Sequence, residues 1–299
     1  MSFESSIEVI EGDALKLFRE VPSKSIDLIV ADPPYNLGKN YGNNHDLKGF
    51  DEYLMFSKSW LTEAHRVLKD NGTIYVFMGV RFISYLYDIL DQQLQMYFNS
   101  WITWHYTQGM GKKKGFSPRH DDILMFTKDE DDFQFNLDYI RIPQKYYRQR
   151  NNMNGANPGD VWEFSHVHYS NPERENHPTQ KPEGIIERIL LASSSENDIV
   201  LDPFAGSGTT LRVAQQLNRR CLGFELNPDY VDMIKRRLEK PFDGFDSVDP
   251  RMSRKPKDLP EDRKTTDGHR QGRPQKVKSS ERVAEYEIPL FSFSEVERK

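Results

Sequence analysis

The sequence has 299 residues, a formal net charge of −5 at neutral pH and an aromatic content of 12%. This is typical of a globular chain of one large or two modest domains, and no apolar run approaches the length needed to cross a bilayer. The single cysteine, Cys221, excludes a disulfide framework, and the first residues lack the basic and apolar regions of a signal peptide. We therefore expect a cytoplasmic protein.

Segments with strand and helix patterns alternate along most of the chain. Strands are predicted at residues 7–15, 25–35, 72–79, 100–106, 121–128, 198–204 and 221–226. Helices are predicted at 14–25, 50–72, 82–96, 182–194, 209–218 and 228–240, with Asn71-Gly72 closing the second. Strands that alternate with helices predict an α/β fold with a doubly wound, mainly parallel sheet.

Two regions break this alternation. From about residue 106 to 176 the chain is polar, aromatic and basic. From about residue 242 onward it loses apolar periodicity and becomes rich in Pro, Lys, Arg and Asp. We expect this second region to be largely disordered, since it has little apolar surface to bury.

A short acidic and proline-containing stretch, Asp32-Pro33-Pro34-Tyr35, ends the strand predicted at 25–35. The two prolines prevent a helix and remove two backbone donors, so nearby carbonyls are left to accept hydrogen bonds from another molecule. Asp32 adds two acceptor oxygens and Tyr35 adds a flat apolar face. The alternative is a tight turn capped by Asp32, and the tetrapeptide alone does not decide between a turn and a site.

A glycine-rich turn, Ala205-Gly206-Ser207-Gly208, lies between a strand that ends at 202–204 and a helix that begins near Thr209. Such a turn lets a ligand approach the main chain at a helix N-terminus. Glu225 ends the next strand, where an acid accepts from the ribose hydroxyls of an adenosine ligand. A purely structural turn is the alternative interpretation.

The turn lacks two features of phosphate-binding loops. No third glycine follows Gly208, as a dinucleotide-binding turn would require, and Thr209 stands where a P-loop needs lysine. A pyrophosphate ligand is therefore disfavoured. S-adenosylmethionine contains adenosine and no phosphate, and it fits the pattern.

Taken together, the motifs DPPY, HPTQKP at 177–182 and LDPFAGSGTT resemble, in this order, the β-group of adenine-specific DNA methyltransferases of bacterial restriction–modification systems. The resemblance covers about residues 8–239. It implies a circularly permuted, Rossmann-like methyltransferase fold with a seven-stranded, mainly parallel sheet, in which 7–15 lies beside 221–226. It also implies a DNA-recognition insert and a disordered tail.

The resemblance assigns a role to individual residues. Asp32, Pro33, Pro34 and Tyr35 fall on the catalytic motif. The cofactor-binding positions are Asp13, Ala14, Leu15, Asp32, His177, Thr179, Lys181, Phe204, Ala205, Gly206, Ser207, Gly208 and Glu225. Within this set, 13–15 would recognise the cofactor's adenine, Glu225 the ribose, and His177, Thr179 and Lys181 the methionine end.

The assigned residues suit transfer of a methyl group to an exocyclic amine. Such an amine is a poor nucleophile because its lone pair is delocalised into the base. Acceptance of its hydrogens by the Asp32 carboxylate and the Pro33 carbonyl would redirect that lone pair toward the methyl donor. The base must first be flipped out of the duplex, with Tyr35 as its stacking partner. Neither a covalent nucleophile nor a metal is expected; zinc at His166 and His168 is a minor alternative.

Basic residues interleaved with aromatic ones predict contacts with double-stranded DNA. These residues are Lys112, Lys113, Lys114, Arg119, Lys145, Tyr146, Tyr147, Arg148 and Arg150. A solvated loop is the alternative for the three lysines. The predicted divisions are a catalytic half at 1–139, a target-recognition insert at 140–176, a cofactor-binding half at 177–241 and a charged, largely disordered tail at 242–299.

Three other functions stay open at this point. A cytosine-N4 DNA methyltransferase would use the same chemistry, although Asp at the first motif position favours adenine. A methyltransferase for RNA or for protein amides is disfavoured by the basic insert and the motif order. A catalytically silent DNA-binding protein is disfavoured by the intact motifs. A cognate restriction endonuclease and a homodimer are plausible partners, and the recognition sequence is not readable from one chain.

Overall fold

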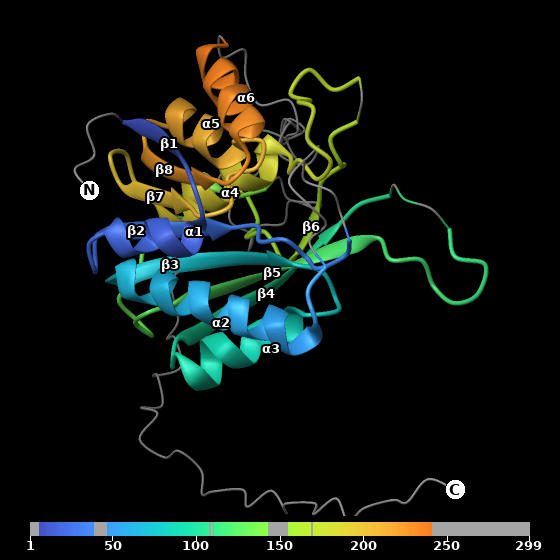
Figure 1. Ribbon diagram of the computed structural model, residues 1–299, viewed down its shortest axis with the longest axis horizontal. Helices are drawn as coiled ribbons and strands as arrows, with labels where there is room; N and C mark the ends of the chain where they lie inside the picture. Colours follow the sequence, from blue (N-terminus) through green and yellow to red (C-terminus); the bar gives the residue numbers. More distant parts are fainter. Residues whose placement is uncertain are drawn as a thin grey trace, which may run out of the picture. The chain divides into compact units, whose positions relative to one another are not determined.

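The computed structural model describes residues 6–38, 47–107, 109, 111–142, 155–168 and 170–240. This part of the chain lies within one compact unit, Met1–Asp258. Eight strands in it form a single sheet with the order β1-β8-β7-β2-β3-β5-β4-β6 (Figure 1). The strands are β1 (Ile7–Glu11), β2 (Ile26–Ala31), β3 (Leu68–Met78), β4 (Tyr97–His105), β5 (His120–Thr127), β6 (Val161–Glu163), β7 (Ile199–Asp202) and β8 (Arg220–Glu225).

The sheet is mainly parallel, as predicted. Only β5 is antiparallel to its neighbours, β3 and β4. The carboxyl ends of the other seven strands therefore lie at one edge of the sheet. The expected pairing of 7–15 with 221–226 is confirmed, with Ile7 opposite Cys221 and Glu11 opposite Glu225. The prediction of seven strands was wrong by one, because β6 of the polar 106–176 region pairs in parallel with β4.

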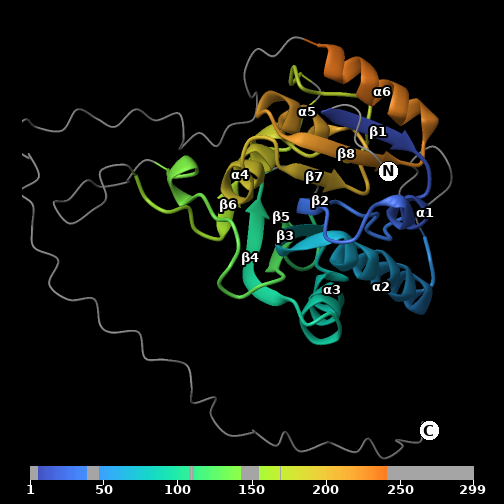
Figure 2. The ribbon, with the colours of Figure 1, turned by 90° about the vertical axis from the view of Figure 1, so that its left-hand side faces the viewer.

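Helices cover both faces of the sheet. They are α1 (Ala14–Leu17), α2 (Phe50–Val67), α3 (Ile83–Asp88), α4 (Glu183–Ser193), α5 (Thr209–Gln216) and α6 (Pro228–Glu239). Figures 1 and 2 show α1 to α3 on one face and α4 to α6 on the other. Short 3₁₀ turns lie at Phe18–Glu20 and Leu137–Tyr139, and a π-helical turn, Ile89–Gln93, follows α3. None of the helices in the described residues is long and apolar enough to cross a membrane.

Two apolar cores follow from the alternation of side chains along the strands. In β2, Ile29 and Ala31 pack into a core that includes Trp60 of α2. Leu28 and Val30 face the opposite way and pack with α4 and α5. Because both faces of β2 are buried, its sequence is continuously apolar apart from Asp27.

The predicted end of the second helix was wrong. Helix α2 ends at Val67, and Leu68 is already extended with φ −67° and ψ 136°. Pairing of β2 with β3 shifts between Ile26–Leu68 and Leu28–Thr73, so Asn71 and Gly72 lie in an irregular part of β3. A Cβ on Gly72 would lie 2.6 Å from the Leu68 side chain. The Asn-Gly pair therefore serves a bulge in the strand rather than a helix cap.

Candidate active site

A cavity of about 910 Å³ opens at the edge where the parallel strands end. This is the expected place for a ligand in an open α/β sheet. Its walls come from segments that follow four strands and from one loop: 12–15 after β1, 32–35 after β2, 202–207 at the end of β7, 225–226 at the end of β8, and 177–181. The predicted residues that line it are Asp13, Ala14, Leu15, Asp32, Pro33, Pro34, Tyr35, His177, Thr179, Lys181, Phe204, Ala205, Gly206, Ser207 and Glu225.

Asp32 lies at the end of β2 with its two carboxylate oxygens in different surroundings. Oδ2 is 2.7 Å from the ammonium group of Lys181, in a nearly buried ion pair. Oδ1 is buried and has no hydrogen-bond partner among the described residues. A buried acceptor without a donor is costly, which indicates that a ligand supplies the donor.

Tyr35 and the second proline are held by neighbouring side chains. The ring centroid of Tyr35 is 5.0 Å from Lys181 Nζ, within range of a cation–π contact. The hydroxyl of Tyr53, on α2, donates to the carbonyl of Pro34 over 2.6 Å. The Pro34 carbonyl therefore already accepts one hydrogen bond within the protein, and the acceptor role of the Pro33 carbonyl stays a prediction.

The glycine loop is bound to the acid that was predicted to contact ribose. Glu225 Oε2 accepts from the backbone N–H of Gly206 over 2.7 Å, and Oε1 accepts from that of Asn227 over 2.8 Å. Burial raises the pKa of Glu225, and these N–H donors oppose that shift. Gly206 has φ +52°, a left-handed conformation that favours glycine.

Gly208 does not line the cavity, unlike the other predicted members of the loop. It precedes helix α5 with φ +73°, and a Cβ there would lie 2.8 Å from Ile234 of α6. Its small size therefore allows close packing of the loop against α6. Phe204 of the same loop packs in the opposite direction, with its ring 5.3 Å from that of Trp60 on α2.

His177 packs against the glycine loop. A Cβ on Gly206 would lie 3.1 Å from His177 Nε2, and the ring of Tyr230 lies edge-on at 4.7 Å. Burial, followed by the nearby charge of Lys181, lowers the pKa of His177 to about 3. The imidazole is therefore neutral at physiological pH and contributes no positive charge to the cavity.

Four further residues that line the cavity were missed by the sequence analysis as site residues: Trp104, Tyr106, Asp121 and His166. The rings of Tyr106 and His166 are 3.9 Å apart, and Trp104 donates its indole N–H to the carbonyl of Phe164 over 2.9 Å. Asp121 is the second residue of β5. The available signal was that 100–106 is a strand, whose end would reach the same edge as Asp32.

Burial also shifts the titration of this group. It raises the pKa of Asp121, with the Asp32 charge adding to the effect and Lys181 opposing it. It raises the pKa of Tyr106 to about 12, with the Asp121 charge as the next cause. It lowers the pKa of His166 to about 4, with a further contribution from Lys181. At physiological pH, Tyr106 and His166 are thus both neutral.

Among the described residues, those predicted to contact DNA do not line the cavity. Lys112, Lys113 and Lys114 are exposed in the connection between β4 and β5, which Figure 1 shows extending away from the sheet. Phe116 in the same connection is 99% exposed. Arg119 precedes β5. The remaining residues predicted to contact DNA, Lys145, Tyr146, Tyr147, Arg148 and Arg150, lie outside the described residues, as does the tail predicted to be disordered.

Comparison with known proteins gives consistent matches over most of the chain. The family model for DNA methylases matches residues 26–236. The chain is 61% identical over 251 residues to the type II methyltransferase M.HpaI of Haemophilus parainfluenzae, covering 84% of this chain and 80% of that protein. It is 40% identical over 245 residues to the DNA adenine methyltransferase YhdJ of Escherichia coli K12, covering 77% and 82%.

Two solved structures share the fold. The structure of M1.HpyAVI in complex with SAM has a TM-score of 0.58 and 25% identity, covering 78% of this chain and all of that one. The cytosine-N4-specific PvuII DNA methyltransferase has a TM-score of 0.63, covering 78% and 86%; at 19% identity it shows the fold alone. The family match and the two relatives show that the chain belongs to the DNA methylase family and is a DNA methyltransferase.

Proposed function

We propose that this chain transfers a methyl group from S-adenosylmethionine to the N6 amine of an adenine flipped out of double-stranded DNA. The observation that carries the proposal is Asp32 Oδ1, a buried acceptor at the cavity with no partner among the described residues. An exocyclic amine supplies the missing donor. The relative named as a DNA adenine methyltransferase, 40% identical, supports adenine as the target.

The residues around the cavity fit the cofactor. Glu225 is placed to accept from ribose hydroxyls, and Gly206 leaves the backbone open to close approach. Residues 13–15 would take the adenine, and His177 and Thr179 the methionine end. When bound, the cofactor supplies an electrophilic methyl group on a positively charged sulfur. A relative at 25% identity was solved with this molecule bound, which supports the assignment.

The catalytic segment would act by accepting hydrogen bonds and by stacking. Asp32 Oδ1 and the Pro33 carbonyl would each accept one hydrogen of the target amine, so that the nitrogen lone pair turns toward the methyl donor. Tyr35 would stack on the flipped base. Holding the two reactants in line is the second contribution and can lower the barrier by ~7–11 kcal/mol.

The lysines of the β4–β5 connection would hold DNA phosphates, and residues 140–176 would carry most of the sequence recognition. In this arrangement 1–139 and 177–241 form the catalytic and cofactor-binding halves. A restriction endonuclease that cleaves the same site is the partner we infer from relatives named type II methyltransferases.

Expression in a host without DNA methylation tests the function directly. Sequencing that detects modified bases would give the site, and digestion to nucleosides would separate N6-methyladenine from N4-methylcytosine. We expect N6-methyladenine at one short sequence with the wild-type chain and none with Asp32→Ala. N4-methylcytosine as the product would overturn the adenine assignment, and unmodified DNA from folded wild-type protein would overturn the whole proposal.

A further inference from the structure

We propose that Lys181 is a positioning residue that acts through Asp32 rather than a ligand of the cofactor's methionine end. It holds Oδ2 so that Oδ1 is presented to the target amine, and it places a positive charge against the carboxylate. The inference rests on the proposed role of Asp32. It departs from the role that the resemblance implied for Lys181.

Contacts of the ammonium group carry the proposal. Lys181 Nζ lies 2.7 Å from Asp32 Oδ2, and its side chain is only 9% exposed. The rings of Tyr35 and Phe77 lie 5.0 and 5.6 Å from the same nitrogen. Lys181 thus contacts both residues assigned to the target base, Asp32 and Tyr35. A charge-assisted hydrogen bond of this length fixes the orientation of the carboxylate.

The two oxygens of Asp32 differ because of this contact. With Oδ2 bound to the ammonium group, rotation of the carboxylate would break the ion pair. Oδ1 therefore keeps its place, buried and without a partner among the described residues. The ammonium group of Lys181 donates to Oδ2, which leaves Oδ1 as the acceptor for the amine. Lysine has donors only, so it offers the hydrogens of the amine no competing acceptor.

The electrostatic surroundings show why Asp32 needs this cation. Asp121 and Asp202 are the acidic groups that act on Asp32 from β5 and β7. His166 and His177 lie near Lys181, but both have lowered pKa values, about 4 and about 3, mainly through burial. Lys181 is the cation among these groups and lies directly against Oδ2. Loss of Lys181 would leave the Asp32 carboxylate near two acids without this ion pair.

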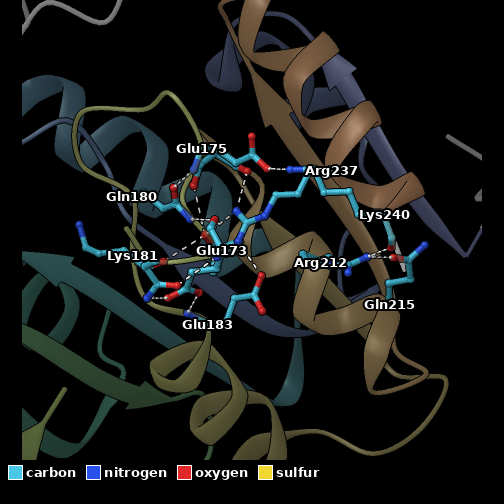
Figure 3. Close-up of polar contacts among 12 residues, drawn as sticks. Glu173, Glu175, Gln180, Lys181, Glu183, Arg212, Gln215, Arg237 and Lys240 are labelled. Atoms are coloured by element: carbon cyan, nitrogen blue, oxygen red, sulfur yellow. Dashed lines mark hydrogen bonds and ion pairs between the residues drawn. The ribbon is translucent and has the colours of Figure 1, made fainter. Parts of the chain in front are cut away.

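The backbone of Lys181 is fixed by a chain of hydrogen bonds. Its carbonyl accepts from the hydroxyl of Thr209 over 3.2 Å. Arg237 of α6 donates to that hydroxyl over 3.1 Å, and its other terminal nitrogen donates to Glu183 Oε1 over 2.6 Å. Glu183 in turn donates its backbone N–H to Glu173 Oε2 over 2.9 Å (Figure 3). The backbone from which the Lys181 side chain extends is therefore fixed, as a positioning residue requires.

The test compares Lys181→Met with Lys181→Arg in the full-length chain. For Lys181→Met we expect kcat to fall on the order of 100-fold. The Kd for S-adenosylmethionine, by calorimetry, should stay within about threefold. Lys181→Arg should recover most of the rate, because it restores a cation next to Oδ2.

The chain offers a matched control in Lys69→Met. Lys69 of β3 pairs with Asp27 of β2 over 2.6 Å, so this variant removes another lysine–aspartate pair, outside the cavity walls. We expect its rate to match the wild type. If Lys181→Met does not fold by circular dichroism, Lys181→Gln takes its place.

Two results would overturn the inference. One is a Kd for S-adenosylmethionine raised tenfold or more, with kcat at saturating cofactor unchanged, because that identifies a cofactor ligand. The other is an unchanged rate. Neither touches the proposed function, which fails separately if folded wild-type chain leaves DNA unmodified.

Discussion

The same dipeptide, Asp-Pro, ends two neighbouring parallel strands and meets opposite conditions in each. Asp32 follows β2; one of its oxygens has no partner among the described residues, while the other is paired with Lys181. Asp202 ends β7, is fully buried, and accepts from the backbone N–H of Phe204 over 3.0 Å. No ion pair joins Asp202 to any described residue.

The difference lies in the charges and donors around each acid. Burial, with smaller contributions from the Asp32 and Glu225 charges, raises the pKa of Asp202 to about 7. Asp32 instead has the ammonium group of Lys181 against Oδ2. The same dipeptide therefore places one carboxylate against a cation and the other against a backbone N–H. The neighbouring groups, rather than the Asp-Pro motif, produce this difference.

Replacing each acid by its amide should give the largest difference in rate between the two positions. We expect Asp32→Asn to lower kcat by about 1,000-fold, because the amide loses the charge that faces the amine. Cofactor affinity should change little. Asp202→Asn should keep at least about a tenth of the rate, since its side-chain oxygen can still accept from Phe204. Single-turnover methylation assays would measure both. Turnover of Asp32→Asn within tenfold of wild type would refute the assigned role.

Tyr35 tests whether the β2 loop works through its ring as well as its acid. Removal of the ring in Tyr35→Ala takes away the stacking surface, and we expect kcat/KM for DNA to fall about 100-fold. Tyr35→Phe keeps the ring and should stay within about threefold. Steady-state kinetics on a duplex would separate them. Equal losses in both variants would assign the effect to the hydroxyl instead.

The pH dependence of stability is a further test of the difference between Asp202 and Asp32. Because its folded-state pKa, about 7, lies above its ordinary value of 3.8, the folded chain binds this proton more tightly than the unfolded chain. Its contribution is therefore fully present below about pH 4 and is lost as the pH rises to about 7. We expect Asp202→Asn to reduce the fall in Tm between pH 5 and pH 8 by a few degrees, roughly 3 °C or more. Parallel Tm profiles for variant and wild type would contradict this.

A third loop at the same edge, the β4–β5 connection, carries lysines where the other two carry acids. Replacement of Lys112, Lys113 and Lys114 by alanine should flatten the dependence of log K on log salt by about 0.9 for each phosphate that a lysine no longer neutralises. Affinity for the cofactor should not change. DNA-binding titrations at several salt concentrations would show this, and an unaltered slope would remove the lysines from the interface.

Much of the site could be predicted because its signals are local. Asp32-Pro33-Pro34-Tyr35 and the glycine turn each follow an apolar strand, and the resemblance then placed 7–15 beside 221–226. The site residues that were missed depend on the order of the strands in the sheet. The place of β5 between β3 and β4, with the addition of β6, brings Asp121 and His166 to the cavity. No local pattern encodes that order.

The partner of Lys181 was also beyond the reach of sequence. It lies 149 positions away in the chain, and a lysine in a proline-rich loop has many plausible partners. Asn71-Gly72 misled the prediction for a related reason. The dipeptide is a common helix ending, but here the backbone had already turned at Leu68 and the pair serves a bulge in β3.

The residues that precede the short strand β6 have a consequence for how the chain tolerates changes of length. Ile142 and Ala156 bond to each other in both directions, over 3.0 and 2.7 Å, so these two residues are held side by side. The cost of closing a loop grows only slowly with its length. A connection of different length between Ile142 and Ala156 should therefore leave β6 and its pairing with β4 in place.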